Sequence, residues 1–183
     1  MEREFAALEE KIASASARIG AEYFQLPVTD ADSVYRERVY CYEFYHQLRC
    51  EWGDFDFSLG GEVDKIGHPH FQDGPYARSK PDLLVHQPGN MNRNLACIEV
   101  KPYTGDAREF RNDLLKLTWF CRHAGYYRGL FIVYGSEADT QDRDLLKAKL
   151  RKASKGHEEI DMARIILWAH ATAAQQGERI NHV

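Results

Sequence analysis

The sequence predicts an α/β protein in which helices flank a mixed β-sheet. Three strand-like segments follow one another between residues 58 and 103, an arrangement typical of an antiparallel meander. Helical and strand-like segments alternate after them, which favours parallel strands joined by helical crossovers. The run at residues 129–135, GLFIVYG, is apolar and bounded by glycines, as expected for a strand covered on both faces.

Length and composition indicate one folded domain. The 183 residues are 44% hydrophobic and 12% aromatic, which excludes a disordered acidic tail. The net charge of −4 argues against a protein that binds nucleic acid through bulk positive charge. We expect a single domain over residues 1–183, with residues 1–25 as an N-terminal helical extension.

The sequence also predicts a cytoplasmic protein without a membrane partner. No apolar run approaches the ~20 residues that span a bilayer, and the charged N-terminus lacks the apolar stretch of a signal peptide. The four cysteines contain no C-x-x-C pair, so their spacing suggests reduced thiols and no zinc site.

Two helices are predicted before the first strand. Residues 1–20 carry apolar side chains at helical spacing, and Pro27 interrupts the segment that follows them. Asp32 or Ser33 is a suitable cap for a second helix that runs to about Cys50. Apolar residues lie on nearly all sides of this second helix, which predicts that it is largely buried.

The meander is predicted from three segments. Residues 58–67 alternate in the manner of a strand, and residues 81–86 form a short strand whose proline suits its first position. Residues 95–103 form the third strand, and the turn-forming residues QPGNMNRN make the last two strands a hairpin.

Four further elements follow the meander. An apolar stripe predicts a helix over residues 107–123, followed by the apolar strand at residues 129–135. Residues 141–155 form an amphipathic helix. Residues 164–170, RIILWAH, fit a last strand, although periodicity alone also allows a helix.

The hairpin carries the most informative group of polar residues, Asp82, Glu99 and Lys101. Side chains alternate along a strand, so Glu99 and Lys101 project from the same face. If the two strands pair across the turn, Asp82 converges with Glu99 at one edge of the sheet. The register that achieves this also directs four apolar side chains to the opposite face: Leu83, Val85, Ile98 and Val100.

Two carboxylates beside a lysine suit metal-assisted phosphate chemistry. Mg²⁺ prefers carboxylate and water oxygens as ligands. A bound metal polarises a phosphoryl oxygen and lowers the pKa of its bound water, while a lysine stabilises the developing negative charge. The sequence therefore predicts Mg²⁺ as cofactor, with Mn²⁺ as a substitute.

These residues resemble the motif of the PD-(D/E)XK nuclease superfamily, which has the restriction-endonuclease-like fold: Pro81-Asp82, a gap, then Glu99-Val100-Lys101. The resemblance implies an α-β-β-β-α-β core with an extra N-terminal helix and C-terminal elements. The core would comprise residues 33–50, 58–67, 81–87, 95–102, 107–123 and 129–135.

The resemblance also implies roles for individual residues. Asp82 and Glu99 would be metal ligands and Lys101 the catalytic lysine. Many members of the superfamily add a glutamate from the first core helix, and Glu43 matches that position. Glu43 lies within the aromatic stretch VYCYEFYH, where burying a carboxylate costs several kcal/mol unless it is paired or bound to a metal. The alternative is a core glutamate hydrogen-bonded to a tyrosine.

Further ligands come from the strand at residues 58–67. Glu62 and Asp64 share one face of it, and Glu62 is favoured as a metal ligand because Gly60 and Gly61 leave room for a close approach. The alternative is a solvated strand edge.

Nucleic-acid contacts are predicted on two helices. Arg143, Lys147, Arg151 and Lys155 recur at i+4 spacing, which favours a stripe that follows phosphates. Lys116, on the preceding helix, would face the site. For each of these residues a solvated charged face is the alternative.

Other chemistries fit the sequence less well. His68 and His70, with His86, could bind zinc, but the pair lies in a Gly- and Pro-rich loop. Cys97 is a poor nucleophile because the nearby carboxylate of Glu99 disfavours its thiolate. A glycosidase would use two carboxylates but gives no role to Lys101. No phosphate-binding glycine motif is present.

The sequence thus predicts a metal-dependent nuclease that hydrolyses phosphodiester bonds. The resemblance favours DNA as the substrate. RNA is an alternative, because no residue pattern in the sequence discriminates for or against a 2′-hydroxyl. A homodimer would suit cleavage of two strands. The alternative function is a catalytically inactive nucleic-acid- or protein-binding module on the same fold, since large superfamilies host members that lack the chemistry.

Overall fold

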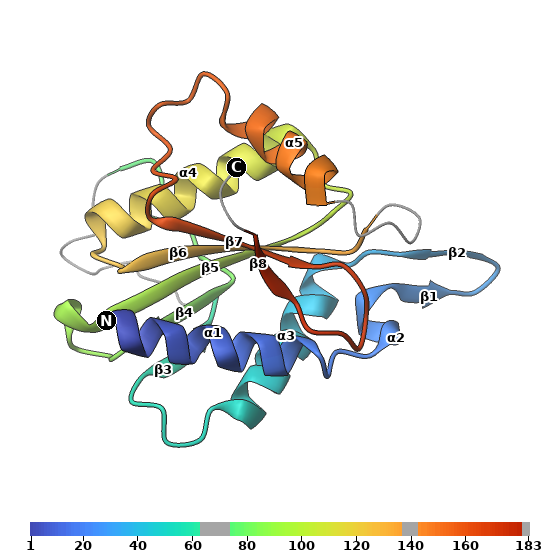
Figure 1. The fold of residues 1–183 in the computed structure, drawn as a ribbon, viewed down its shortest axis with the longest axis horizontal. Coiled ribbons are helices and arrows are strands. Elements are labelled where there is room, and N and C mark those ends of the chain that lie inside the picture. Colours follow the sequence, from blue (N-terminus) through green and yellow to red (C-terminus); the bar gives the residue numbers. More distant parts are fainter. Residues whose placement is uncertain (63–73, 137–142, 181–183) are drawn as a thin grey trace.

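The computed structural model describes residues 1–62, 74–136 and 143–180 (Figure 1). Within these residues a six-stranded mixed sheet has the order β3-β4-β5-β6-β7-β8. The first three strands pair antiparallel, β5, β6 and β7 pair parallel, and β8 returns antiparallel to β7. The strands are β3 (Ser58–Gly61), β4 (Leu83–His86), β5 (Asn94–Pro102), β6 (Arg128–Tyr134), β7 (Ile165–His170) and β8 (Glu178–Ile180).

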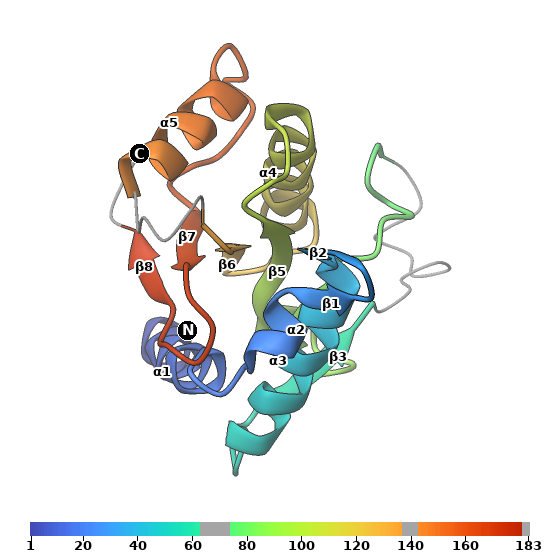
Figure 2. The same ribbon diagram turned by 90° about the vertical axis from the view of Figure 1, so that its right-hand side faces the viewer.

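Helices cover both faces of the sheet, which confirms the α/β class with a mixed sheet. In Figure 1, α4 (Ala107–His123) and α5 (Arg143–Ser154) lie above the sheet, and α1 (Glu2–Ser16) and α3 (Glu37–Glu51) lie below it. Figure 2 shows β5 between α4 and α3. The end of β5 therefore lies where two helices from different parts of the chain meet the sheet.

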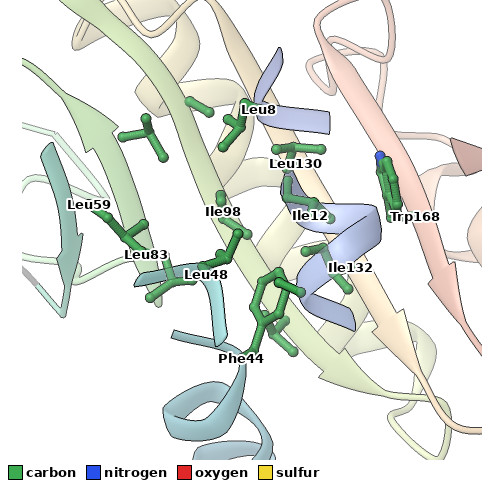
Figure 3. Close-up of a cluster of buried hydrophobic side chains, with 14 of the residues drawn as sticks. Leu8, Ile12, Phe44, Leu48, Leu59, Leu83, Ile98, Leu130, Ile132 and Trp168 are labelled. Carbon is green, nitrogen blue, oxygen red and sulfur yellow. The ribbon is translucent and has the colours of Figure 1, made fainter. Parts of the chain in front are cut away.

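The alternation of side chains along the strands sorts them into two cores. Ile98 of β5 packs with Leu8 of α1 and Leu48 of α3 in the core on the lower face (Figure 3). Cys97, one position earlier, packs with Leu117 of α4 in the core on the upper face. The predicted register is confirmed, because all four apolar residues that it directs away from the acids belong to the lower core: Leu83, Val85, Ile98 and Val100.

The helix predicted over residues 107–123 has the observed bounds of α4. A capping box fixes its start: the side chain of Asp106 accepts hydrogen bonds from the backbone N–H groups of Arg108 and Glu109, and the side chain of Glu109 accepts one from the N–H of Asp106. These bonds satisfy N–H groups that have no partner within the helix. The end of β5 and the start of α4 are thereby held in a fixed relation.

The predicted start of the second helix is wrong. Residues Ala31–Val34 form strand β2, which pairs antiparallel with β1 (Leu26–Val28), so Asp32 and Ser33 lie in a hairpin. Asp30 makes the tight turn with φ 59°, a left-handed conformation that Asp adopts more readily than most residues. Helix α3 begins only at Glu37.

The expected burial of this helix on nearly all sides is also wrong. One stripe of α3 is buried, and it consists of Tyr40, Cys41, Phe44 and Leu48. Tyr42 lies outside that stripe with an exposed fraction of 63%. The aromatic residues of α3 therefore lie on two faces of the helix: one packs against the sheet, and the other is exposed to solvent.

The segments at the two ends of the chain join the same fold. Residues 1–25 contain α1 and the short α2 (Ala21–Phe24), and α1 contributes Phe5, Leu8 and Ile12 to the lower core. Residues 164–170, for which periodicity left two possibilities, form strand β7. None of the helices in the described ranges is long and apolar enough to cross a membrane.

An aromatic cluster fixes α3 against the ends of β6 and β7. The ring of Tyr40 stacks on Tyr134 with centroids 3.9 Å apart, and Phe24 contacts both rings edge-on. A buried hydrogen bond of 2.8 Å joins the Tyr40 hydroxyl to Nδ1 of His170. Burial lowers the pKa of His170 to about 4, so the imidazole is neutral in the folded protein near neutral pH.

This cluster predicts an acid-sensitive stability. The unfolded chain would protonate His170 with a pKa near 6.5, so the stability that the neutral ring contributes is complete above that pH and declines as the pH falls towards 4. His170→Gln keeps a neutral polar side chain. Between pH 7.5 and pH 4.5 we expect the wild type to lose about 2.5 kcal/mol more than the variant, as measured by urea unfolding. Equal losses in the two proteins would contradict the prediction.

Candidate active site

The hairpin of β4 and β5 brings Asp82 to Glu99. Leu83 pairs with Ile98, so the next step of the antiparallel register places Asp82 opposite Glu99. Oδ2 of Asp82 accepts a hydrogen bond of 2.7 Å from the backbone N–H of Val100. The side chain of Asp82 thus continues the ladder at the point where β4 begins, and this bond fixes the carboxylate beside β5.

Both carboxylates are poorly solvated. Glu99 is 2% exposed, and its Oε1 atom is buried without a hydrogen-bond partner. Burial, followed by the negative charge of Asp82, raises the pKa of Glu99 well above its usual range. Burial also raises the pKa of Asp82 to about 6, against the lowering effect of the Val100 hydrogen bond. Such a pair of acids strongly favours a nearby cation.

Two lysines supply part of that positive charge. Nζ of Lys101 lies 2.6 Å from Oε2 of Glu37 and 3.3 Å from Oδ2 of Asp113. Nζ of Lys116 lies 2.8 Å from Oε2 of Glu99 and 3.5 Å from Oδ1 of Asp113. Burial alone would lower the pKa of Lys101, but Asp113 and Glu37 raise it, so its ammonium group stays charged. The site is therefore a compact network of alternating charges.

The first core helix contributes Glu37 to this network, in place of the predicted Glu43. Glu43 lies six positions after Glu37, which at 3.6 residues per turn places their side chains about 120° apart around α3. Oε1 of Glu43 accepts a hydrogen bond of 2.6 Å from Nε2 of Gln47, on the same helix. Glu37 lies four residues before Cys41, on the stripe that faces the sheet. That spacing is the sequence signal that identifies Glu37 once the buried face of α3 is known.

Asp113 is the second residue that the sequence prediction missed. It lies on α4, is 6% exposed, and contacts both Lys101 and Lys116. Its position three residues before Lys116 places the two on one helix face. The predicted orientation of Lys116 towards the site is what the structure shows, and Asp113 shares that orientation.

A pocket of about 430 Å³ opens beside Asp82, between α3 and the β3–β4 edge of the sheet. The predicted ligand Glu62 lies on its wall, where its backbone N–H donates to the carbonyl of Asp82 and its side chain pairs with Arg38 at 3.3 Å. Asp64 lies outside the described residues. The lining comprises Glu37, Arg38, Cys41, Tyr42, Tyr45, Gly61, Glu62, Asp82 and Leu83.

Of the basic residues predicted to form a stripe, Arg143, Lys147 and Arg151 lie on α5 outside its buried face, and Lys155 follows the end of the helix. Leu146, Leu150 and Ala153 form the buried face of the helix. Arg151 and Lys155 are exposed and Lys147 is half-buried, while Arg143 forms an ion pair of 2.5 Å with Glu178.

The helix is tied to the site through another lysine. Nζ of Lys149 donates to the carbonyls of Tyr103 and Gly105, in the loop that follows Lys101.

The acids fit a hard divalent cation better than zinc. Asp82, Glu99, Glu37 and Glu62 offer only carboxylate oxygens, the ligands that Mg²⁺ and Mn²⁺ prefer. The orphaned Oε1 of Glu99 is an acceptor that such a cation would satisfy. In the described part of the chain no group of three or more His, Cys, Asp or Glu side chains is already arranged as a metal site.

The described residues do not support the alternative of a zinc site. His68 and His70 lie outside the described residues, and Nδ1 of His86 forms a 3.0 Å hydrogen bond with the hydroxyl of Tyr126.

Because Asp82 and Glu99 are buried, we expect their negative charges to destabilise the metal-free protein at neutral pH. A raised pKa means that the contribution of Asp82 to stability is complete below pH 3.8 and is lost as the pH rises through about 6. Asp82→Asn removes the charge and keeps an oxygen acceptor for Val100. In the presence of a chelator, we expect the free energy of unfolding of the variant minus that of the wild type to be about 2 kcal/mol larger at pH 8 than at pH 4, which means that the variant is relatively more stable at pH 8.

Urea unfolding measures this difference, and Glu10→Gln, which removes an exposed carboxylate from α1, is the matched control. A pH-independent effect of Asp82→Asn, or one equal to that of Glu10→Gln, would show that burial does not disfavour the charge of Asp82.

No family model, curated protein or solved structure matches this chain.

Proposed function

We propose that this chain is a divalent-metal-dependent nuclease that hydrolyses phosphodiester bonds on a restriction-endonuclease-like core. The chain order α3, β3, β4, β5, α4, β6 agrees with the α-β-β-β-α-β order that the PD-(D/E)XK resemblance implies. The three motif residues also gather at one end of β5, which supports the proposal.

The charge balance of the site is the observation that carries the proposal. Four carboxylates, those of Asp82, Glu99, Glu37 and Asp113, surround the ammonium groups of Lys101 and Lys116. With all six groups ionised, a state that burial of Glu99 and Asp82 disfavours in the absence of a cation, two negative charges are unmatched, and these equal the charge of one divalent cation. Oε1 of Glu99 and Oδ2 of Asp113 lie among them, buried and without a hydrogen-bond partner. An unsatisfied buried acceptor costs free energy, and a bound cation would satisfy it.

Each residue of the site has its own role in the proposed reaction. Asp82 and Glu99 would hold Mg²⁺ or Mn²⁺, with Glu37 or Glu62 reaching it from the side of the pocket. The cation, when bound, supplies a polarised phosphoryl oxygen and a water of lowered pKa. Lys101, held between Glu37 and Asp113, stabilises negative charge that develops on the phosphate.

Lys116 has a different role from the one predicted for it. Its ammonium group is bound to Glu99 and Asp113 and is 19% exposed, so it orients the Glu99 carboxylate and does not face a passing strand. We assign it as a positioning residue. Contacts with the nucleic-acid backbone are left to the exposed basic residues of α5.

The first test is cleavage. With Mg²⁺ we expect hydrolysis of DNA, and we expect Asp82→Asn and Lys101→Met each to lower the rate by about 100-fold or more, since each removes a group that acts on the reacting phosphate. Glu37→Gln should lower the rate strongly and Glu43→Gln should leave it nearly unchanged. Single- and double-stranded DNA and RNA substrates, analysed on denaturing gels, measure these effects.

Cleavage that persists in both the Asp82 and the Lys101 variants would overturn the site assignment. Tight binding without cleavage under any divalent metal would favour the alternative function, a non-cleaving nucleic-acid-binding module on the same fold.

The second test concerns α5. Because each neutralised phosphate releases counterions, Arg151→Gln should reduce the slope of log K against log salt by about 1. Lys152→Gln, which removes the same charge from a different face of the helix, should change the slope much less. Fluorescence anisotropy with labelled DNA in a chelator measures both slopes. Equal effects of the two substitutions would indicate bulk electrostatics, and no effect of either would exclude α5 from the interface.

A further inference from the structure

Tyr42 is an exposed aromatic side chain at the candidate active site that the chemistry above does not use. Its exposed fraction of 63% is the highest among the exposed large apolar residues of the described chain. It lies on α3 next to Cys41 and lines the pocket that opens on Asp82. An aromatic ring left in water at the mouth of such a pocket is a candidate contact surface for a ligand.

A second tyrosine accompanies it. Tyr45 lines the same pocket from three residues further along α3, so the two side chains are neighbours on the helix surface. The hydroxyl of Tyr45 lies 3.5 Å from the carbonyl of Leu59 on β3, which orients that ring against the sheet edge. The pocket, about 430 Å³ in volume, thus has one aromatic wall.

The other groups of the pocket limit what it can bind. Glu37, Glu62 and Asp82 are acidic, and the guanidinium of Arg38 is engaged by Glu62 at 3.3 Å. A phosphate inside the pocket would meet net negative charge. A flat, uncharged ring with amino groups would stack on the tyrosines and could donate hydrogen bonds to the carboxylates. Adenine, cytosine and guanine have these properties, and every base has the flat face that stacks on an aromatic ring.

We propose that this pocket binds one unstacked base, next to the phosphate that is cleaved at Asp82 and Glu99, with Tyr42 as its stacking surface. The inference rests on the proposed nuclease function and narrows its substrate class. A base within an intact duplex is paired and stacked on its neighbours, and its extraction breaks the base pair and both stacking contacts. The substrate is therefore a single-stranded or frayed nucleic acid.

The test measures binding without cleavage. In a chelator, fluorescence anisotropy compares a labelled single-stranded oligonucleotide with the duplex of the same sequence. We expect tighter binding of the single strand. Tyr42→Ala should weaken that binding about tenfold, since one base–aromatic stack contributes on the order of 1–3 kcal/mol. Tyr42→Phe should bind as the wild type does, because the ring is retained.

Tyr23→Ala is the matched control, since Tyr23 is also exposed, at 40%, but lies on α2 outside the pocket. An oligonucleotide of abasic sugars should bind the wild type and Tyr42→Ala equally. The proposal is overturned if Tyr42→Ala binds as the wild type does, if Tyr42→Phe is as weak as Tyr42→Ala, or if the duplex binds more tightly.

Cleavage and binding assays on the same variants can refute the base pocket and the nuclease function independently. Metal-dependent cleavage that is insensitive to Tyr42→Ala would refute the base pocket and leave the nuclease. Tyr42-dependent binding of single strands without cleavage under any metal would refute the nuclease and leave the pocket.

Discussion

The antiparallel register of β4 and β5 is the constraint on which the rest of the site depends. It places Asp82 opposite Glu99, and the hydrogen bond from the Val100 N–H to Asp82 holds the first acid against the second. Like charges opposite each other destabilise a sheet. The register persists because the same alternation buries Leu83 and Ile98 in the lower core. Apolar burial on one face thus offsets electrostatic repulsion on the other.

Helices on both sides of the sheet contribute charged side chains around these two acids. Glu37 of α3 and Asp113 of α4 hold Lys101 between them, and Lys116 of α4 reaches Glu99. The stacked rings of Tyr40 and Tyr134 fix α3, and the capping box at Asp106 fixes the start of α4. The helices that carry Glu37, Asp113 and Lys116 are thereby fixed by contacts outside the charged network, which is what a preorganised site requires.

Local signals explain which parts of this arrangement the sequence could predict. The bounds of α4 follow from an apolar stripe and a cap that belong to the same short segment, and the hairpin follows from alternation around a turn. The start of α3 was mispredicted because Asp32, a good capping residue, lies in the β1–β2 hairpin. Glu37 lies within the predicted helix, but a helix expected to be buried on nearly all sides offers no face on which to prefer Glu37 to Glu43. The role of Asp113 arises only from tertiary contacts with Lys101 and Lys116, which no spacing within α4 encodes.

The contact between α5 and the loop after β5 connects the proposed nucleic-acid-binding surface of α5 to the strand that carries Lys101. Lys149 holds the carbonyls of Tyr103 and Gly105, and its ammonium group lies 4.3 Å from the centre of the Tyr103 ring. Lys101 is only two residues before Tyr103. In the proposed nuclease, a nucleic acid bound to α5 would therefore be connected, through Lys149 and a few covalent bonds, to Lys101, the proposed catalytic lysine. A rigid substrate and a flexible one would differ in how they displace this connection.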